Sequence, residues 1–183
     1  MIDVRMPFST SGNLGQAYNE AMDESKAKWV LLMDQDVLPM HPNWYSMLCK
    51  AIEIYPDAGL MTCYVSKIGS VMQQHVLSPP NVFPITAHRV FGKNLWQTSG
   101  MNATAFTVPS QHVSGCFMLV RKQTWKELNG FKNGFFGVDW NFTKKVFASR
   151  WKIYRLNGLY VYHLRWREPA WLDGAKVSLD FNP

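Results

Sequence analysis

The 183-residue sequence predicts an α/β fold: a GT-A-like, Rossmann-like, mostly parallel sheet flanked by helices. Residues 29–33 (WVLLM) form a short, wholly apolar run of strand length, typical of a strand buried on both faces. Segments with helical spacing of apolar residues lie on either side of it, and a second apolar run follows at 58–65. This strand–helix–strand order predicts a parallel βαβ unit.

The first half of the chain reads as alternating strands and helices. Asn13 is a suitable N-cap for a helix whose apolar residues recur at helical spacing. In order, we expect a weak strand at 1–6, a helix at about 14–26, the strand at 29–33, a helix at 42–55 and a strand at 58–65.

The second half is less regular. Residues 66–110 lose periodicity and contain four prolines, so we expect a functional loop region with short strands. Asn157-Gly158 is a hairpin-turn dipeptide and predicts that two closing strands meet there. The other expected elements are a strand at 112–120, a helix at 121–128 stopped by Asn129-Gly130, a turn at 134–137, a helix at 138–149, closing strands at 151–156 and 159–163, and a basic, Trp-bearing tail at 166–183.

Composition narrows the functional classes. No apolar run approaches the roughly 18–20 residues that span a bilayer, and the N-terminus lacks the features of a secretory signal. Three cysteines without CxxC spacing predict buried free thiols, so we expect a cytoplasmic protein, in solution or on a membrane surface. The net charge of +6, concentrated towards the C-terminus, predicts an anionic partner. Because no nucleic-acid-binding motif is present, we do not expect nucleic acid to be that partner.

Two carboxylates, Asp34 and Asp36, directly follow the 29–33 strand. Side chains alternate along an extended chain, so the two point the same way with Cα atoms roughly 6–7 Å apart. The carboxyl end of a buried strand is where open α/β sheets bind ligands, and paired carboxylates suit Mg²⁺ or Mn²⁺, which would in turn hold phosphate. The alternative interpretation is an acidic turn that caps the next helix.

Five segments in order resemble inverting family 2 glycosyltransferases of GT-A fold. They span roughly residues 13 to 165, and each alone is a weak signal. They are the Asn13-Leu-Gly-x-Ala-x-Asn19 motif, the Asp-x-Asp strand Val30–Asp36, the acceptor-side strand Ser114–Arg121, the segment Leu128–Trp140 with its Gly-Phe and Val-Asp pairs, and the closing Tyr162-His163.

The resemblance implies a role for each matched residue. Asp34, Asp36 and His163 would bind Mn²⁺ or Mg²⁺, and Asp139 would be the general base that deprotonates the acceptor. Donor binding is implied for Asn13, Gly15, Asn19, Asp34, Arg165 and Arg167, and acceptor binding for Gly115, Trp140 and Trp166. The implied partners are a nucleotide-diphosphate sugar donor and a glycan or lipid-linked acceptor.

The sequence departs from the family pattern at two places. Val138 stands where the family usually has a glutamate before the aspartate. Two strands and a helix that bind the nucleotide base normally precede the Asn-Gly motif, and only about twelve residues precede it here. We therefore expect residues 1–165 to be a glycosyltransferase domain shortened at its N-terminus, with the base site absent or completed by a second copy or a second chain.

Simpler interpretations remain open. Asp139 would also serve as a helix N-cap, and an isolated histidine such as His163 is more often packed than a ligand. Two other functional classes are a non-catalytic nucleotide- or sugar-binding module and a phosphatase with Asp34 as nucleophile. Phosphatases of that class usually carry Thr or Val where this chain has Leu38.

Overall fold

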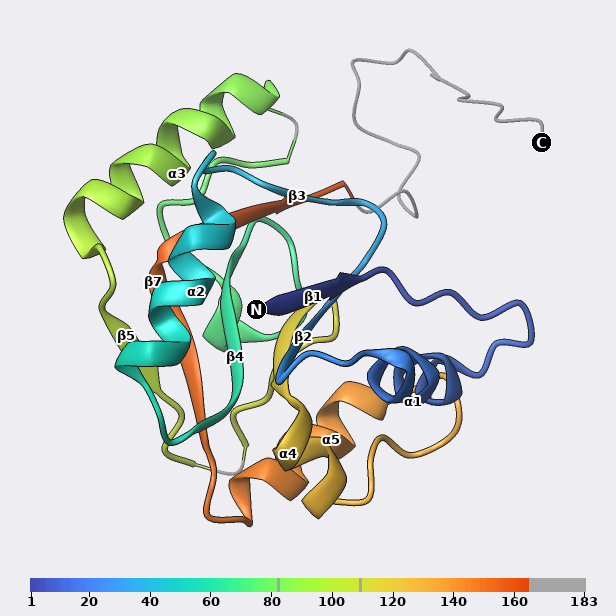
Figure 1. Ribbon diagram of the computed structural model, residues 1–183. Coiled ribbons are helices and arrows are strands. Elements are labelled where there is room, and N and C mark those ends of the chain that lie inside the picture. Colours follow the sequence, from blue (N-terminus) through green and yellow to red (C-terminus); the bar gives the residue numbers. More distant parts are fainter. Residues whose placement is uncertain (82, 109, 165–183) are drawn as a thin grey trace.

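The structure, a computed structural model, describes residues 1–81, 83–108 and 110–164. Within these residues the strands form one sheet, and the helices surround it (Figure 1). The strands are β1 (Ile2–Arg5), β2 (Trp29–Met33), β3 (Val37–Pro39), β4 (Ala58–Val65), β5 (Ala103–Ala105), β6 (Phe117–Arg121) and β7 (Lys152–His163). The helices are α1 (Leu14–Glu24), α2 (Trp44–Ile54), α3 (Ile85–Ser99), α4 (Lys122–Glu127) and α5 (Val138–Phe147), with a 3₁₀ turn, η1 (Val71–Gln73).

The sheet is mixed, with four of its seven described strands running in one direction. Its order is β1-β2-β6-β4-β7-β3, and β5 also pairs with β7. β1 is parallel to β2 and β4 is parallel to β7, whereas β6 is antiparallel to both of its neighbours, β2 and β4. The predicted α/β fold is confirmed, but β6 separates the two strands of the expected βαβ unit.

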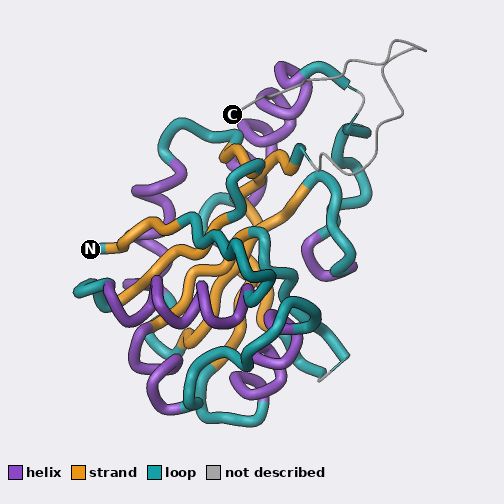
Figure 2. Tube along the Cα trace, turned by 90° about the vertical axis from the view of Figure 1, so that its right-hand side faces the viewer, coloured by secondary structure: helices purple, strands orange, loops and turns teal. Residues whose placement is uncertain are grey.

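Two hydrophobic cores lie on opposite faces of the sheet. Because side chains alternate along β2, Leu31 packs with Met47 and Leu48 of α2, and Leu32 packs with Met22 of α1. α4 and α5 share the α1 face, and α3 packs with β7 and with Met40, which follows β3, in a smaller cluster. The strands are therefore covered on both faces, as the side view in Figure 2 shows.

Local signals set several element boundaries as predicted. The Asn13 side chain accepts a hydrogen bond from the Gln16 amide and begins α1. Asn129 and Gly130 both have positive φ angles and end the α4 segment. The β6 strand, however, begins at Phe117 rather than at residue 112.

The expectation of a loop region at residues 66–110 is wrong in part. The short strand β5 is present, but α3 occupies fifteen residues of this stretch. The buried face of α3 consists of His88, Gly92 and Leu95. A histidine and a glycine contribute nothing to an apolar periodicity, which is why the helix escaped detection.

The predicted hairpin at Asn157-Gly158 is also wrong. β7 is one continuous strand of twelve residues, and Gly158 does not have the positive φ that a two-residue hairpin turn needs. Cys63 on β4 pairs with Leu156 and Tyr64 pairs with Tyr160, so residues 157–159 form a bulge against β4. The Asn157 amide instead donates to the Asn102 carbonyl, 2.9 Å away.

Two predictions from composition were tested by the structure. The cysteines Cys49, Cys63 and Cys116 are free, and the last two are buried. Among the helices of the described residues, none combines the length and the apolar character that crossing a bilayer requires. The tail at 166–183 lies outside the described residues.

Candidate functional site

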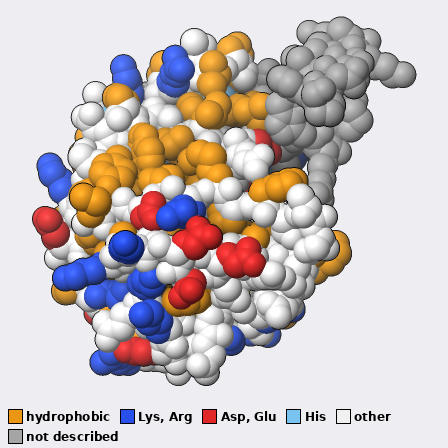
Figure 3. Space-filling model, turned by 45° about the vertical axis from the view of Figure 1, so that its right-hand side comes forward, with side chains coloured by type: hydrophobic (Ala, Val, Ile, Leu, Met, Phe, Trp, Pro, Cys, Tyr) orange, Lys and Arg blue, Asp and Glu red, His pale blue; other side chains and the backbone are white. Residues whose placement is uncertain are grey.

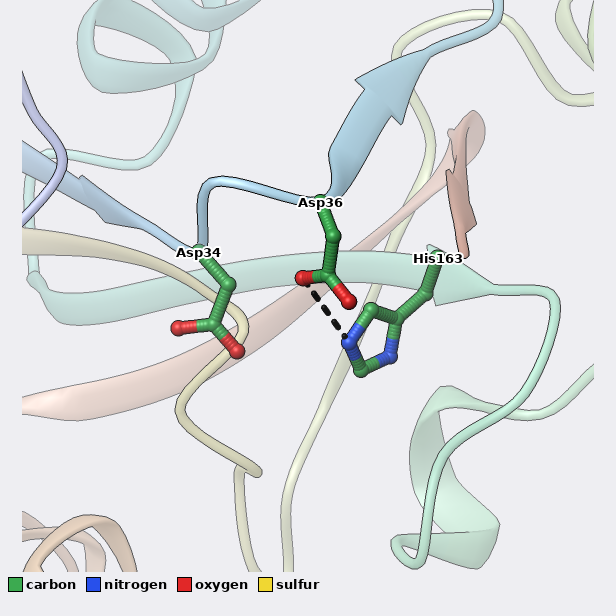
Figure 4. A group of neighbouring side chains, drawn as sticks. All are labelled: Asp34, Asp36 and His163. Carbon is green, nitrogen blue, oxygen red and sulfur yellow. Dashed lines mark ion pairs between the residues drawn. The ribbon is translucent and has the colours of Figure 1, made fainter. Parts of the chain in front are cut away.

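Asp34, Asp36 and His163 come together at one edge of the sheet. One ligand atom from each of the three lies within 4.8 Å of the other two. His163 Nε2 is 3.4 Å from Asp36 Oδ1. Figure 4 shows the two carboxylates and the imidazole ring around a common space. The structure thus assembles the three residues to which the family resemblance assigned metal binding.

Strand pairing explains why residues so distant in sequence meet. Asp34 follows the carboxyl end of β2, and Asp36 immediately precedes β3. β3 pairs antiparallel with β7 so that Val37 lies opposite His163, and the Leu164 amide donates to the Asp36 carbonyl at 2.9 Å. Because β2 and β7 run in the same direction, their carboxyl ends lie at the same edge of the sheet, where α/β folds bind ligands.

Three hydrogen bonds fix the orientation of His163. Its main-chain amide donates to Ser66 Oγ at 3.1 Å, and its carbonyl accepts from Asn81 Nδ2 at 3.0 Å. Its Nδ1 lies 3.0 Å from the Lys67 carbonyl oxygen. A carbonyl oxygen can only accept, so Nδ1 carries a proton and donates it. In the neutral ring, Nε2 is then left with a lone pair directed at Asp36.

This arrangement fits a divalent cation. A carboxylate oxygen and an imidazole lone pair that face each other at 3.4 Å repel one another unless a cation or a proton lies between them. An Nδ1–H···O=C hydrogen bond is the outer-shell contact that metal-ligating histidines commonly make. Two carboxylates and one imidazole suit Mn²⁺, and Mg²⁺ favours the carboxylates alone.

The pKa of the Asp34 carboxyl group is raised above its ordinary value. Burial raises its pKa, and the nearby carboxylates of Asp36 and Asp139 raise it further, while His163 acts in the opposite direction. Bringing three acids to one partly buried edge costs folding free energy that a cation would offset if one were bound. Such a concentration of like charge is typical of functional sites.

Asp139 lies in the first turn of α5, close enough to Asp34 for its charge to raise the pKa of that carboxyl group. Gly137, which has a left-handed conformation, is the N-cap, so Asp139 is not the helix cap. Its Oδ2 accepts from the Gly115 amide at 2.8 Å, and its Oδ1 accepts from the Trp140 amide at 2.7 Å. A carboxylate has about four acceptor positions, so capacity remains for a substrate hydroxyl.

Asn13, Gly15 and Asn19 are positioned to hold the segment that leads to Asp139. Asn13 Oδ1 accepts from the Gly134 amide at 2.8 Å, and the Gly15 amide donates to the Gly134 carbonyl at 3.0 Å. Asn19 binds both the amide and the carbonyl of Phe131. A Cβ on Gly15 would lie 1.8 Å from the Lys132 carbonyl oxygen. These contacts give the three residues a structural role, and donor binding by them stays a prediction.

Of the three residues implied in binding the acceptor substrate, Gly115 and Trp140 are described and Trp166 is not. Gly115 contacts Asp139, and Trp140 is about half exposed, with Lys144 Nζ 3.6 Å from the centroid of its ring. Arg165, Trp166 and Arg167, which were predicted to bind donor or acceptor, lie outside the described residues.

Two described basic residues near the C-terminus, Arg150 and Lys152, do not face this site. Arg150 pairs with Glu127, and Lys152 pairs with Asp57. Both lie at the start of β7, at the opposite end of that strand from His163. On the face drawn in Figure 3, Lys and Arg side chains gather at the lower left beside several acidic side chains.

Two residues that lie beside the site were not identified from the sequence. Tyr18 is buried on α1, its hydroxyl 3.5 Å from the Gly115 carbonyl oxygen, and burial together with Asp34 and Asp139 raises its pKa well above the usual value. The Gln73 side chain accepts from the Ser114 amide at 2.6 Å and donates to Thr62 Oγ1 at 2.8 Å. The helical spacing marked Tyr18 only as a core residue, and no sequence signal marked Gln73.

Comparison with known proteins shows the fold. No protein-family model matches the sequence, and no curated protein matches it either. Among solved structures, the crystal structure of Staphylococcus aureus TarS 1–349 in complex with UDP-GlcNAc matches with a TM-score of 0.55 and 16% identity, over 92% of this chain and 43% of that one. A second TarS 1–349 crystal structure has a TM-score of 0.48 and 15% identity, over 83% of this chain and 41% of that one.

The chain therefore spans less than half of the TarS structures that it matches. TarS is a glycosyltransferase, and at this level of identity the likeness is one of fold. The chain has a glycosyltransferase-like α/β fold, with Asp34, Asp36, His163 and Asp139 gathered at one edge of its sheet.

Proposed function

We propose that the chain is a metal-dependent, inverting glycosyltransferase related to family 2. It transfers a sugar from a nucleotide-diphosphate donor to a glycan or lipid-linked acceptor. The observation that carries the proposal is the convergence of Asp34, Asp36 and His163 at the carboxyl edge of a glycosyltransferase-like sheet. The TarS neighbour in complex with UDP-GlcNAc supports a nucleotide-sugar donor.

Each residue has a distinct task in this proposal. Asp34, Asp36 and His163 Nε2 hold Mn²⁺ or Mg²⁺, and the cation supplies positive charge that offsets the charge of the departing diphosphate. Asp139, held by the Gly115 amide, accepts the proton of the acceptor hydroxyl as that oxygen attacks the anomeric carbon. The new bond forms on the face opposite the bond that breaks, so the configuration inverts.

A second candidate is a non-catalytic nucleotide-sugar-binding module, because three grouped ligands at a sheet edge would suffice to hold a diphosphate through a cation. In that case the Asp34–Asp36–His163 cluster binds a donor that the chain does not turn over. The phosphatase alternative is less favoured. Leu38 stands where phosphatases of that class usually carry Thr or Val, and the fold matches that of TarS, a glycosyltransferase.

Calorimetric titration with UDP, GDP and their sugar conjugates, with and without Mn²⁺, tests the proposal. We expect one nucleotide to bind only when Mn²⁺ is present. Loss of an outer-shell partner alone typically weakens metal binding by about 10–100-fold, so we expect Asp36→Asn and His163→Ala to weaken binding by about 100-fold or more. Glu53→Gln, which removes an exposed carboxylate on α2, is the matched control and should bind normally.

Transfer assays of the wild-type chain and of Asp139→Asn, run together, separate the two candidates. As a glycosyltransferase variant, Asp139→Asn should retain metal-dependent donor binding and lose transfer to acceptor mixtures. Metal-dependent binding without transfer by the wild-type chain would favour the binding module. Binding of no nucleotide under any condition, by a chain shown to be folded, would refute a working donor site.

A further inference from the structure

The loop before α5 ends in an exposed aromatic tip, residues 134–137 (Gly-Phe-Phe-Gly). Phe136 is 84% exposed and Phe135 is 42% exposed. Their rings meet edge to face with centroids 5.0 Å apart. The glycines on either side both have positive φ angles, which lets the chain turn sharply and project the two rings.

Hydrogen bonds hold the residues before the aromatic tip against α1, so the fold itself keeps the two rings exposed. Asn19 binds Phe131 through both main-chain groups, and Gly134 exchanges hydrogen bonds with Asn13 and Gly15. This segment therefore runs alongside α1 at the periphery of the molecule (Figure 1). The loop leading to Asn13 carries another exposed ring, Phe8.

The segment that carries the aromatic tip is mostly basic. Residues 131–147 contain three lysines and one acid, Asp139. Lys132 is exposed, has no hydrogen-bond or ion-pair partner among the described residues, and lies beside Gly137. Lys144 is exposed over the ring of Trp140. Projecting apolar side chains beside long basic ones are typical of segments that enter the interface of an anionic bilayer.

We propose that the aromatic tip inserts into the surface of an anionic lipid bilayer. Phe136 and Phe135 enter the boundary between headgroups and acyl chains, while Lys132 and Lys144 contact the anionic headgroups. Docking in this way places Asp139, three residues after Phe136, close to the bilayer surface. The membrane contact stands independently of sugar transfer, because the aromatic tip contains none of the metal-site residues.

Sedimentation with vesicles of phosphatidylcholine, with and without phosphatidylglycerol, tests this inference. We expect binding to the anionic vesicles to be about tenfold tighter or more, since two lysines near such a surface attract its anionic headgroups. Phe136→Ser should weaken that binding about tenfold, because one buried aromatic ring is lost. Lys132→Gln combined with Lys144→Gln should abolish the preference for phosphatidylglycerol.

The chain offers a matched control in Val76 and Leu77, an exposed apolar pair without neighbouring lysines. Val76→Ser/Leu77→Ser should bind vesicles as the wild type does. Unfolding curves and nucleotide titrations of Phe136→Ser should be unchanged, which distinguishes a failed membrane contact from a failed donor site. Equal binding to both vesicle types, full binding by Phe136→Ser, or no binding at all would each overturn the proposal, and a protein partner for the aromatic tip would then be sought.

Discussion

At the scale of single residues, Gly115 determines how Asp139 is presented. Its amide donates to the Asp139 carboxylate, and the Tyr18 hydroxyl lies 3.5 Å from its carbonyl oxygen. A Cβ at this position would lie 2.7 Å from the Tyr18 hydroxyl oxygen and 3.6 Å from Asp139. Tyr18 is only 2% exposed and cannot move aside. The absence of a side chain at Gly115 is therefore a requirement of the site.

Gly115→Ala should destabilise the chain and impair transfer together. We expect the free energy of unfolding, measured by urea denaturation, to fall by about 1–3 kcal/mol, because an added methyl group meets a closely packed wall. Transfer should fall because the Asp139 carboxylate is displaced, whereas metal-dependent donor binding, measured by calorimetry, should persist.

Two further variants make this test specific. Gly69→Ala adds a methyl group where nothing lies within 4 Å, so it should leave stability unchanged or raise it slightly. Tyr18→Phe removes the hydroxyl that the new methyl group meets, and the double variant Gly115→Ala/Tyr18→Phe should recover part of the lost stability. Equal effects of Gly69→Ala and Gly115→Ala would show that steric contact is not the cause.

Which site residues can be predicted from sequence depends on how local their relationship is. The spacing of Asp34 and Asp36 after a buried strand is local, and it predicted that the two act together. They lie, however, in a turn between β2 and β3 and not on extended chain, with the Val37 amide donating to the Asp34 carbonyl at 3.3 Å. His163 joined them only through the family resemblance. The contacts of Gly115 with Asp139 and Tyr18 join residues 24 and 97 positions apart, and no pattern along the chain encodes them.

At the scale of elements, β7 shows how a strong local signal can be overridden. Asn-Gly favours a tight hairpin turn, but here β4 pairs with β7 before and after that dipeptide, β5 pairs with β7 just before it, and the chain stays extended. Gly158 is needed for another reason, since a Cβ there would lie 2.1 Å from the Gly100 carbonyl oxygen. The dipeptide marks a bulge onto which the end of α3 packs closely.

Gly158→Ala should therefore be severely destabilising. The nearest contact is with the main-chain carbonyl of Gly100, so relief requires β7 or the end of α3 to shift, and we expect a loss of about 3 kcal/mol or more in urea denaturation. A glycine in a hairpin turn would lose only about 1 kcal/mol on the same substitution, through its positive φ. A loss of that smaller size would contradict the continuous strand.

At the scale of the whole molecule, the sheet brings together the ends of strands that are remote in sequence. The site lies at the carboxyl edge because β2 and β7 run in the same direction, with β6 and β4 between them. The apolar strands predicted that parallel framework. The insertion of antiparallel β6 was not predictable, because its apolar sequence specifies burial on both faces but not direction.

The packing around β3, β7 and α3 also predicts how stability depends on pH. Burial lowers the pKa of His41, His75 and His88, and the positive charges of Lys93 and Arg155 add to this at His41 and His75 respectively. Just below the ordinary histidine pKa of about 6.5, these rings bind fewer protons in the folded chain than in the unfolded chain. Stability should therefore fall as pH drops below about 6.5, towards the lowered folded values.

Urea unfolding in the presence of a chelator, between about pH 7.5 and 5.5, measures this slope without metal at His163. The triple variant His41→Gln/His75→Gln/His88→Gln should show a flatter dependence, even though loss of the buried His88–Tyr160 contact lowers its stability at every pH. The slope isolates the titration because the packing defect is the same at every pH. An unchanged slope in the triple variant would assign the acid sensitivity to other groups.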